Sequence, residues 1–308
     1  MINSAYQIIR TIRPRQWLKN LAVFAAPIFH GIIFDGDVFW RSTLAFFAFT
    51  LLVSGIYIFN DLSDVEKDKQ HPIKKNRPIA SGKLSKKTAK IMVVLFYLAG
   101  FSLSYFYVGT FFSIVGLTYV LLQTSYSLYF RNIIILDALI VSTGFIMRVF
   151  AGGLAVDVSI SSWLVLTTIG LSLLLAFGKR RSEKTLLSDI VEKKTRNTLQ
   201  HYPDALLDSI ISMSSSFCIL SYALFTFQTS PRNESALSDL LPSILKAPKW
   251  MMLTIPLVIY GVARYLYVIY EKKEGESPER VLLSDKPLFT TVLLWGIAIL
   301  LIIYVLPN

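Results

Sequence analysis

The chain has 308 residues, of which 54% are hydrophobic and only 17% are charged, and its mean hydropathy is +0.54. This composition excludes an ordinary soluble domain and is typical of a polytopic membrane protein. The net charge of +11 is compatible with nucleic-acid binding and also with the basic loops of membrane proteins, so the placement of the charges decides between them.

Apolar runs long enough to cross a bilayer recur along the whole chain. Nine of them are expected to form spanning helices, at about residues 18–34, 39–59, 89–107, 109–128, 133–154, 161–177, 209–228, 249–270 and 288–306. The fold class is therefore all-α. Long charged loops follow the second and sixth spans, which suggests two four-helix halves plus a ninth helix, with a site between the halves. No linker interrupts the series, so residues 1–308 are expected to form a single transmembrane domain.

The basic residues lie mostly on one side of this predicted topology. With the N-terminus inside, 25 Lys and Arg residues fall in inside segments and 4 in outside segments. Such an asymmetry follows the positive-inside rule. It removes most of the case for a nucleic-acid partner, and it predicts a multi-pass protein of the cytoplasmic (inner) membrane whose N-terminus and charged loops are cytoplasmic.

The loop after the second span, FNDLSDVEKDKQHPIKKNRPIASGK, combines acids and bases. If the helix continues past the membrane edge, one face carries four oxygen-bearing side chains within about 100°. These are Asn60, Asp61, Asp64 and Asp68, and Lys67 lies close to the same face. Crowded carboxylates repel one another unless a cation lies among them, and oxygen ligands that face phosphates favour Mg²⁺. The pattern predicts a Mg²⁺ site for a diphosphate; a solvated helix end is the alternative.

The same segment carries a family resemblance. NDLSDVEKD resembles the NDxxDxxxD motif of the UbiA superfamily of intramembrane prenyltransferases, and RPIASG resembles the loop that follows that motif. The resemblance covers nearly the whole chain and implies a UbiA-like fold of nine helices in two four-helix halves around a central cavity, with Mg²⁺ holding a diphosphate. We expect Asp61, Asp64 and Asp68 to be metal ligands, with Asp61 and Asp64 as the catalytic residues.

The loop after the sixth span departs from the classical family pattern. FGKRRSEKTLLSD places Lys179, Arg180 and Glu183 where a second acidic motif would be expected. Bases bind phosphate rather than metal, although charges at a membrane edge would look the same. Together with RPRQWLKN (13–20) and SPERVLLSDKPL (277–288), this run resembles the decaprenyl-phosphate phosphoribosyltransferase branch. Members of that branch transfer 5-phosphoribose from phosphoribosyl diphosphate (PRPP) to a polyprenyl phosphate and release diphosphate.

Two further places contribute candidates. The short loop YSLYFRN contains Tyr126 and Arg131 and resembles a family motif that approaches the diphosphate, although an interfacial tyrosine is equally typical of an aromatic belt. Asp137 and Arg148 lie in the fifth span on one helix face, about 16 Å apart, so they cannot pair with each other. A charge at that depth needs a polar partner. Arg148 is expected to meet either a phosphate or a neighbouring helix.

These observations predict an Mg²⁺-dependent phosphoribosyltransferase that acts on PRPP and a polyprenyl phosphate. Its predicted substrate-binding residues are Lys19, Asn60, Lys67, Arg77, Tyr126, Arg131, Arg148, Lys179, Arg180 and Glu183. The alternatives are a true prenyltransferase that joins an allylic diphosphate to an aromatic or other acceptor, and a transporter that uses the charged residues of its helices. A homo-oligomer is compatible with the sequence.

Overall fold

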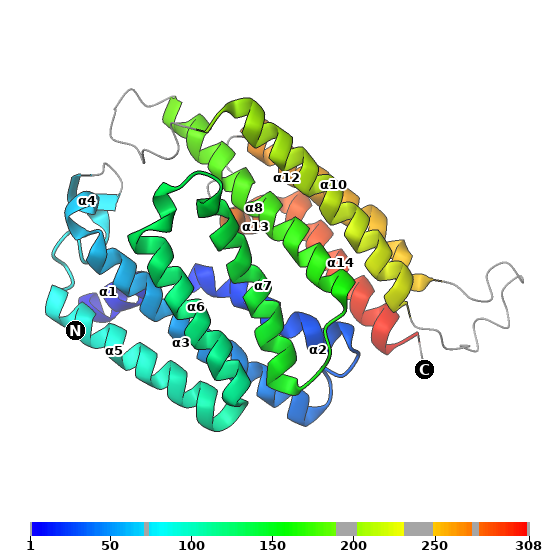
Figure 1. The fold of residues 1–308 in the computed structure, drawn as a ribbon, viewed down its shortest axis with the longest axis horizontal. Coiled ribbons are helices and arrows are strands. Elements are labelled where there is room, and N and C mark those ends of the chain that lie inside the picture. Colours follow the sequence, from blue (N-terminus) through cyan, green and yellow to red (C-terminus); the bar gives the residue numbers. More distant parts are fainter. Residues whose placement is uncertain (1, 71–73, 189–201, 231–248, 273–276, 307–308) are drawn as a thin grey trace, which may run out of the picture. The chain divides into compact units, whose positions relative to one another are not determined.

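The computed structural model describes residues 2–70, 74–188, 202–230, 249–272 and 277–306. In these ranges the regular structure is helical throughout (Figure 1). Eight helices are long and apolar enough to cross a membrane, and they match the second to ninth predicted spans. The prediction of an all-α, multi-pass membrane fold is confirmed.

By its internal contacts the chain divides into two compact units, which are described separately. Unit 1 comprises residues 1–27, 34–140 and 147–158, and unit 2 comprises residues 28–33, 141–146 and 159–308. Unit 1 contains three complete spanning helices and most of a fourth, and unit 2 contains four. Two four-helix groups were predicted, but the additional segment is the first of the predicted series and not the ninth.

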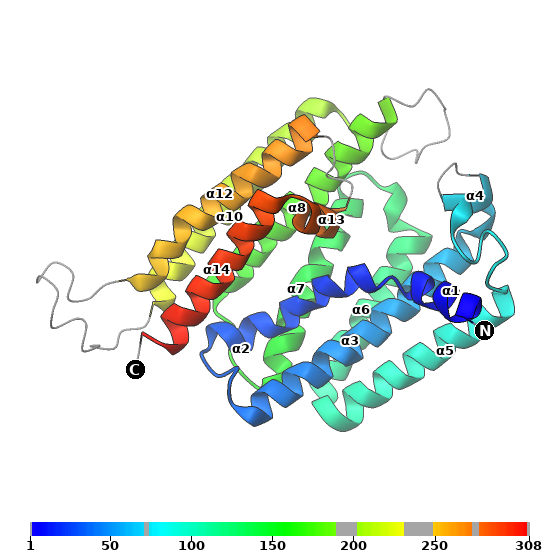
Figure 2. The same ribbon diagram turned by 180° about the vertical axis from the view of Figure 1, so that it is seen from behind.

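Unit 1 is built around a long central helix, α3 (Gly36–Ser63). Its other elements are α1 (Ile2–Ile12), η1 (Pro14–Phe24), α4 (Val65–Gln70), η2 (Lys74–Asn76), α5 (Lys86–Leu103), η3 (Ser104–Val108), α6 (Thr110–Leu128), η4 (Phe130–Asn132) and most of α7 (Leu136–Val156). The α3 helix packs against η1, α5 and α6, as Figures 1 and 2 show. Phe49, Leu52 and Phe112 are fully buried at the centre of this packing. Because α3 is apolar on most sides, it can be enclosed by its neighbours.

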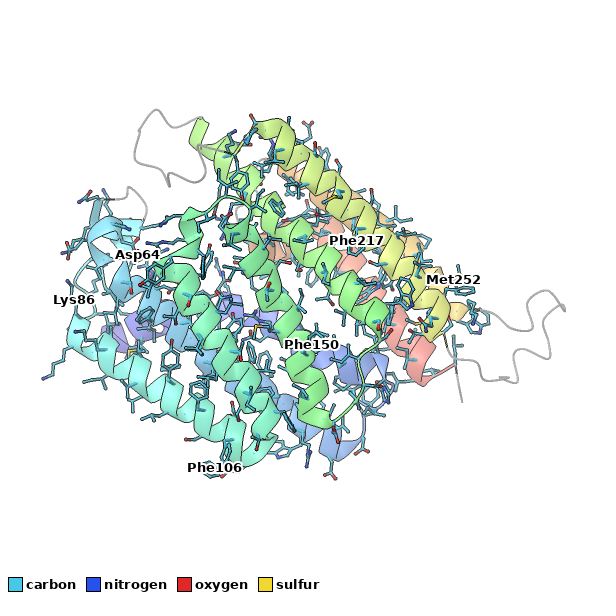
Figure 3. The ribbon with its side chains drawn as sticks, viewed as in Figure 1. Asp64, Lys86, Phe106, Phe150, Phe217 and Met252 are labelled. Atoms are coloured by element: carbon cyan, nitrogen blue, oxygen red, sulfur yellow. The ribbon has the colours of Figure 1, made fainter. Side chains whose placement is uncertain are left out.

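Charged and apolar residues separate along unit 1. Figure 3 places Asp64 and Lys86 at one end of the unit and Phe106, whose ring is largely exposed, at the other. Exposed apolar side chains also continue along α5, including Leu95 and Leu98. In a membrane-spanning helix such a face contacts lipid, which is as apolar as the side chains themselves.

The first predicted span, residues 18–34, takes a different form from the other eight. It consists of the 3₁₀ helix η1 and the short helix α2 (Ala25–Phe29), and it is not among the eight helices of spanning length. Pro27 has no backbone N–H to donate, and Gly31 has a φ of 80°, a left-handed conformation that favours glycine. The apolar composition was recognised, but these two residues prevent a long regular helix.

Unit 2 contains the other four spanning segments. They lie in α8 (Ser162–Ser188), α10 (Asp204–Thr229), η6, α12 and η7 together (Trp250–Lys272), and α14 (Lys286–Tyr304). The unit also contains the short helix α13 (Pro278–Ser284). The α8 helix packs along α10, and α12 packs along α14. Asp285 begins α14 by accepting a hydrogen bond from the backbone N–H of Leu288 at 3.0 Å.

Gly152 permits the closest backbone approach within unit 1. A Cβ atom at this position of α7 would lie 1.9 Å from the carbonyl oxygen of Val23 in η1. A backbone atom cannot move aside as a flexible side chain can. Only glycine therefore allows η1 and α7 to lie at this distance.

We expect Gly152→Ala to lower the free energy of unfolding by about 1–3 kcal/mol, because overpacking forces the two backbones apart. Thermal unfolding of the purified protein in detergent measures the effect. Gly296→Ala in α14 is the matched control, since a Cβ there meets nothing within 4 Å. Equal melting temperatures for the two variants would contradict the proposed backbone contact.

Candidate active site

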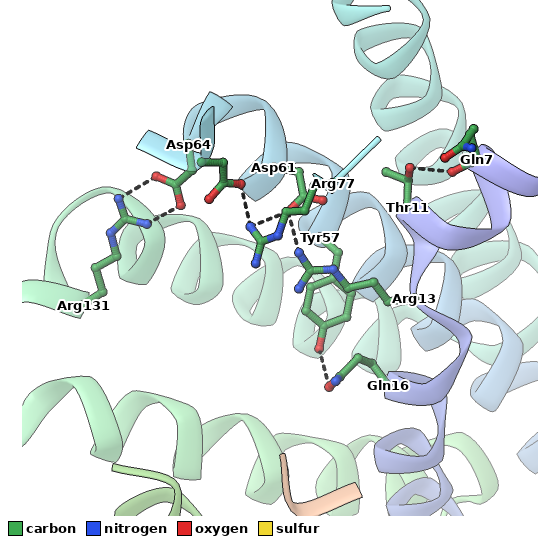
Figure 4. Close-up of polar contacts among 10 residues, drawn as sticks. Gln7, Thr11, Arg13, Gln16, Tyr57, Asp61, Asp64, Arg77 and Arg131 are labelled. Carbon is green, nitrogen blue, oxygen red and sulfur yellow. Dashed lines mark hydrogen bonds and ion pairs between the residues drawn. The ribbon is translucent and has the colours of Figure 1, made fainter. Parts of the chain in front are cut away.

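The acidic motif lies where α3 ends and α4 begins. The α3 helix stops at Ser63, Asp64 has a non-helical conformation (φ −99°, ψ 7°), and α4 starts at Val65. The backbone N–H of Asp64 still bonds to Asn60, and that of Asp68 to Asp64. One uninterrupted helix was expected through the motif, but the helix is interrupted at the single residue Asp64. The break directs Asp64 to a different partner from those of Asp61 and Asp68 (Figure 4).

Arg77 bridges two of the three carboxylates. Its Nη1 donates to Asp61 Oδ1 at 3.1 Å and to Asp68 Oδ2 at 2.7 Å. Arg13 Nη2 donates to the same Asp61 oxygen at 2.5 Å. The side chains of Asp61 and Asp68 are only 3% and 4% exposed, whereas those of the two arginines are 29% and 27% exposed. The two partly exposed arginines thus neutralise the charge of two nearly buried acids.

Asp64 is paired with Arg131 in the segment after α6. Arg131 Nη1 donates to Oδ2 at 2.6 Å and Nη2 donates to Oδ1 at 2.7 Å, the two-pronged geometry that guanidinium and carboxylate groups favour. Partial burial by itself would raise the pKa of Asp64, but the hydrogen bonds and charge of Arg131 outweigh it and hold the pKa below its usual value. Asp64 is therefore ionised at neutral pH.

The donor set fits a hard cation such as Mg²⁺. Asp61, Asp64 and Asp68 offer only oxygen, and the buried Asn60 Oδ1 has no hydrogen-bond partner. In the described ranges, no group of three or more acidic, His or Cys side chains is arranged to hold a metal ion. Instead, Arg77 Nη1 stands as a cation between the oxygens of Asp61 and Asp68. We conclude that the oxygen ligands are suitable for Mg²⁺. In this structure the three carboxylates are paired with arginines.

Other predicted site residues lie around this cluster. Lys19 Nζ donates to Gln16 Oε1 at 2.6 Å, and the Tyr57 hydroxyl donates to the same oxygen at 3.2 Å. Lys67 is exposed on α4, and Tyr126 is half-buried near the end of α6, one turn before Arg131. Lys19 is therefore linked to the site through Tyr57, over whose ring Arg13 lies at 5.0 Å.

Arg13, Gln16 and Tyr57 were not predicted as site residues. Arg13 belongs to the opening RPRQWLKN segment, but its contact with Asp61 depends on a left-handed backbone (φ 54°) just before Pro14. A residue before proline is disfavoured in the α conformation, and one with positive φ is uncommon when it is not glycine. The Arg-Pro pair was the available sequence signal for a sharp turn at this point.

Arg148 is held within unit 1 by neutral groups and aromatic rings. Nε donates to Asn20 Oδ1 at 2.9 Å, and Nη2 donates to the Tyr119 hydroxyl at 2.8 Å. The guanidinium carbon lies 4.8 Å from the centre of the Tyr119 ring and 5.4 Å from that of Phe49. Asn20 in turn donates to Thr50 Oγ1 at 2.9 Å. Arg148 was expected to meet either a phosphate or a neighbouring helix, and these contacts join it to neighbouring helical segments.

The basic run of α8 lies in unit 2 and carries its own acids. Glu183 accepts from Arg180 Nη1 at 2.8 Å and lies 3.6 Å from Lys179 Nζ. The Arg180 side chain is 3% exposed and that of Lys179 is 38% exposed. Arg181, on the same helix, donates to Asp208 at 2.8 Å. Lys179 and Arg180 thus pair with Glu183 one turn along the same helix.

Asp285, in the SPERVLLSDKPL segment of unit 2, is a buried carboxylate. Both of its oxygens accept from Arg264 at 3.0 Å, and one also accepts from Lys272 at 2.7 Å. The hydrogen bonds from Arg264 and Lys272 and that from the backbone of Leu288 hold the pKa of Asp285 well below its usual value. This residue ties α12, η7 and α14 together.

Comparison with known proteins supports the family resemblance over most of the chain. The sequence model of the UbiA prenyltransferase family matches residues 23–290. A decaprenyl-phosphate phosphoribosyltransferase of Corynebacterium glutamicum is 33% identical, over 99% of this chain and 89% of the relative. Another, from Mycolicibacterium smegmatis, is 34% identical over 94% of this chain and 89% of the relative.

Solved structures show the same fold at lower identity. A UbiA homolog from Archaeoglobus fulgidus, solved with GPP and Mg²⁺ bound, superposes with a TM-score of 0.69 at 17% identity, covering 96% of this chain and 99% of that chain. An apo UbiA homolog from Aeropyrum pernix gives a TM-score of 0.56 at 15% identity over 94% and 98% of the two chains. At these identities the likeness concerns the fold alone.

The ion pair between Asp64 and Arg131 predicts a pH-dependent contribution to stability. Because the folded-state pKa of Asp64 is lowered, the stabilisation is present above the unfolded pKa of about 4 and is lost as the pH falls through the folded value. We expect Arg131→Gln to destabilise the protein by about 1 kcal/mol at pH 7, after allowance for partial exposure. The difference from the unmodified protein should shrink as the pH falls below about 4.

Unfolding in detergent at several pH values measures this difference. Lys86→Gln is the control, because its partner Glu66 is 70% exposed and the pair is open to solvent. A loss of stability in Arg131→Gln that does not change with pH would show that the effect does not come from the charge of Asp64.

Proposed function

The chain belongs to the UbiA prenyltransferase family, and on that premise we propose that this membrane-bound transferase moves 5-phosphoribose from PRPP to a polyprenyl phosphate. The observation that carries the proposal is the alignment, over nearly the whole chain, with relatives named decaprenyl-phosphate phosphoribosyltransferase. The site supports it chemically. Oxygen ligands and arginines lie side by side at the end of α3, as a metal-bound diphosphate requires.

The reaction is a substitution at the anomeric carbon of PRPP. The bond from C1 to the diphosphate oxygen breaks, diphosphate leaves with the electron pair, and an oxygen of the lipid phosphate forms the new bond to C1. The lipid phosphate is already ionised at neutral pH, so no strong general base is needed. Charge grows on the departing diphosphate, and stabilising that charge is the main task of the site.

We assign the roles of this chain's residues from that requirement. Asp61, Asp64 and Asp68 would hold Mg²⁺, directly or through water, with Asn60 orienting the group. The bound ion would supply electrostatic stabilisation of the diphosphate. Arg77, Arg131 and Lys19 would donate hydrogen bonds to phosphate oxygens, and so would Lys67 and Tyr126 at the edge of the cluster.

The basic run of α8 favours a sugar phosphate over an allylic diphosphate. Lys179 and Arg180 supply donors that suit the 5-phosphate of PRPP, and Glu183 would accept from ribose hydroxyl groups. A prenyltransferase would need apolar or aromatic surface for a carbocation and usually a second set of acids. We therefore keep the prenyltransferase reaction as the second candidate.

We place the reaction at the cytoplasmic face of the cytoplasmic membrane. The proposal rests on the charge asymmetry of 25 basic residues in the loops on one side against 4 on the other. The acidic motif and the α8 run both belong to the basic side of that topology. PRPP is a water-soluble donor, so it would approach from the aqueous phase while the lipid tail stays in the bilayer.

Transfer of label from PRPP tests the proposed reaction directly. We expect the purified protein with PRPP labelled in the ribose, polyprenyl phosphate and Mg²⁺ to yield a labelled lipid, and chelation of Mg²⁺ to stop its formation. A parallel reaction with an allylic polyprenyl diphosphate and an aromatic acceptor tests the second candidate. Product from that pair, with none from PRPP, would reject phosphoribosyl transfer.

We expect Asp64→Asn to reduce turnover by about 100-fold or more, because a neutral amide is a weaker partner for both the metal and Arg131. Glu66→Gln is the control, as Glu66 lies two residues away, is 70% exposed and pairs with Lys69 and Lys86. Turnover is measured with the lipid-labelling assay, and thermal unfolding shows that both variants are folded. Activity of Asp64→Asn close to that of Glu66→Gln would refute the role of Asp64.

A further inference from the structure

Arg77 contacts two of the acids that would hold a metal ion. A single atom, Nη1, lies 3.1 Å from Asp61 Oδ1 and 2.7 Å from Asp68 Oδ2, and both carboxylates are almost fully buried. Arg77 directly follows η2, and Figure 4 shows its guanidinium group beside Asp61, to which Arg13 also donates.

We propose that Arg77 is a placeholder cation, which must leave Asp61 and Asp68 before a metal ion can bind and which leaves readily only when a diphosphate is present to receive it. Metal and diphosphate therefore bind to this site together, and neither binds tightly alone. The inference rests on the proposed function only in that the motif holds a metal with a diphosphate, whatever group that diphosphate carries.

Electrostatics gives the reason for this coupling. Without a cation the two buried carboxylates would repel each other, so Arg77 stabilises the metal-free state. A metal ion that binds alone must displace the guanidinium, which then loses two charged acceptors and gains none. With diphosphate present, the same guanidinium finds phosphate oxygens that suit its fork of donors. The cost of displacement is then largely offset.

The remaining arginines fit the same arrangement. Arg13 also donates to Asp61, so the loss of Arg77 does not leave that carboxylate without a cation. Arg131 holds Asp64 by two hydrogen bonds and would delay metal access to the third acid in the same way. The structure thus gives a matched pair of variants, Arg77→Gln and Arg131→Gln, that remove different parts of the obstruction.

Metal binding in the absence of substrate tests the proposal. We would titrate the purified full-length protein in detergent with Mn²⁺ alone, with inorganic diphosphate alone and with their preformed complex, and follow the signal of free Mn²⁺ by electron paramagnetic resonance. For the unmodified protein we expect the complex to bind about 5- to 150-fold more tightly than Mn²⁺ alone, the usual range of coupling between two ligands. Diphosphate should gain affinity from Mn²⁺ by the same factor.

Arg77→Gln should bind Mn²⁺ alone about tenfold more tightly than the unmodified protein, and its additional gain from diphosphate should shrink. Lys75→Gln is the control, because it removes the same charge from the same exposed segment without touching Asp61 or Asp68. It should leave the affinity for Mn²⁺ alone nearly unchanged. An equal gain in both variants would show a general charge effect and overturn the placeholder role.

Thermal unfolding gives an independent readout of the same events. Mg²⁺ alone should raise the melting temperature of Arg77→Gln more than that of the unmodified protein, because the variant binds the ion more tightly in the absence of diphosphate. If Arg77→Gln does not fold, Arg131→Gln should show the same direction of change through Asp64. Tight binding of Mn²⁺ alone by the unmodified protein would overturn the inference. Since neither PRPP nor lipid is present, this result is independent of which group the enzyme transfers.

Discussion

Neutralisation of three acids at the end of α3 is the interaction on which unit 1 depends. Asp61 and Asp68 are nearly buried, and ionised groups in such places are stable only when they are paired. The arginine partners of Asp61, Asp64 and Asp68 come from segments far apart in the chain, at residues 13, 77 and 131. The pairs therefore fix the turn before η1, the η2 segment and the segment after α6 onto one helix end. The side chains that we propose to carry the chemistry also hold the local structure together.

Unit 2 also contains ion pairs, but the ratio of acids to bases differs from that in the cluster of unit 1. In α8, acids and bases lie one turn apart, so Glu183 already neutralises part of the charge of Lys179 and Arg180. Asp285 has the opposite arrangement, with one buried acid held by Arg264 and Lys272. Lys179 and Arg180 are thus already paired, so a phosphate would have to compete with Glu183 for them.

The sequence was sufficient for the fold class, because eight apolar runs carry a strong signal of length and composition. It was also sufficient to single out the acidic motif, since the spacing of Asp61, Asp64 and Asp68 is local. It could not show that α3 breaks at Asp64, because one non-helical residue has no distinct composition. Nor could it show that Arg13 reaches Asp61, since that contact joins residues 48 positions apart through an unusual turn.

Arg148 has a consequence for the order in which the membrane domain is made. Placing an arginine in the bilayer costs at least about 2.5 kcal/mol during insertion if no partner is at hand. Two of its hydrogen-bond partners, Asn20 and Tyr119, precede it in the chain. Because synthesis proceeds from the N-terminus, these groups enter the membrane before α7 does. The α7 helix, which carries Arg148, therefore enters a membrane that already contains hydrogen-bond partners for this arginine.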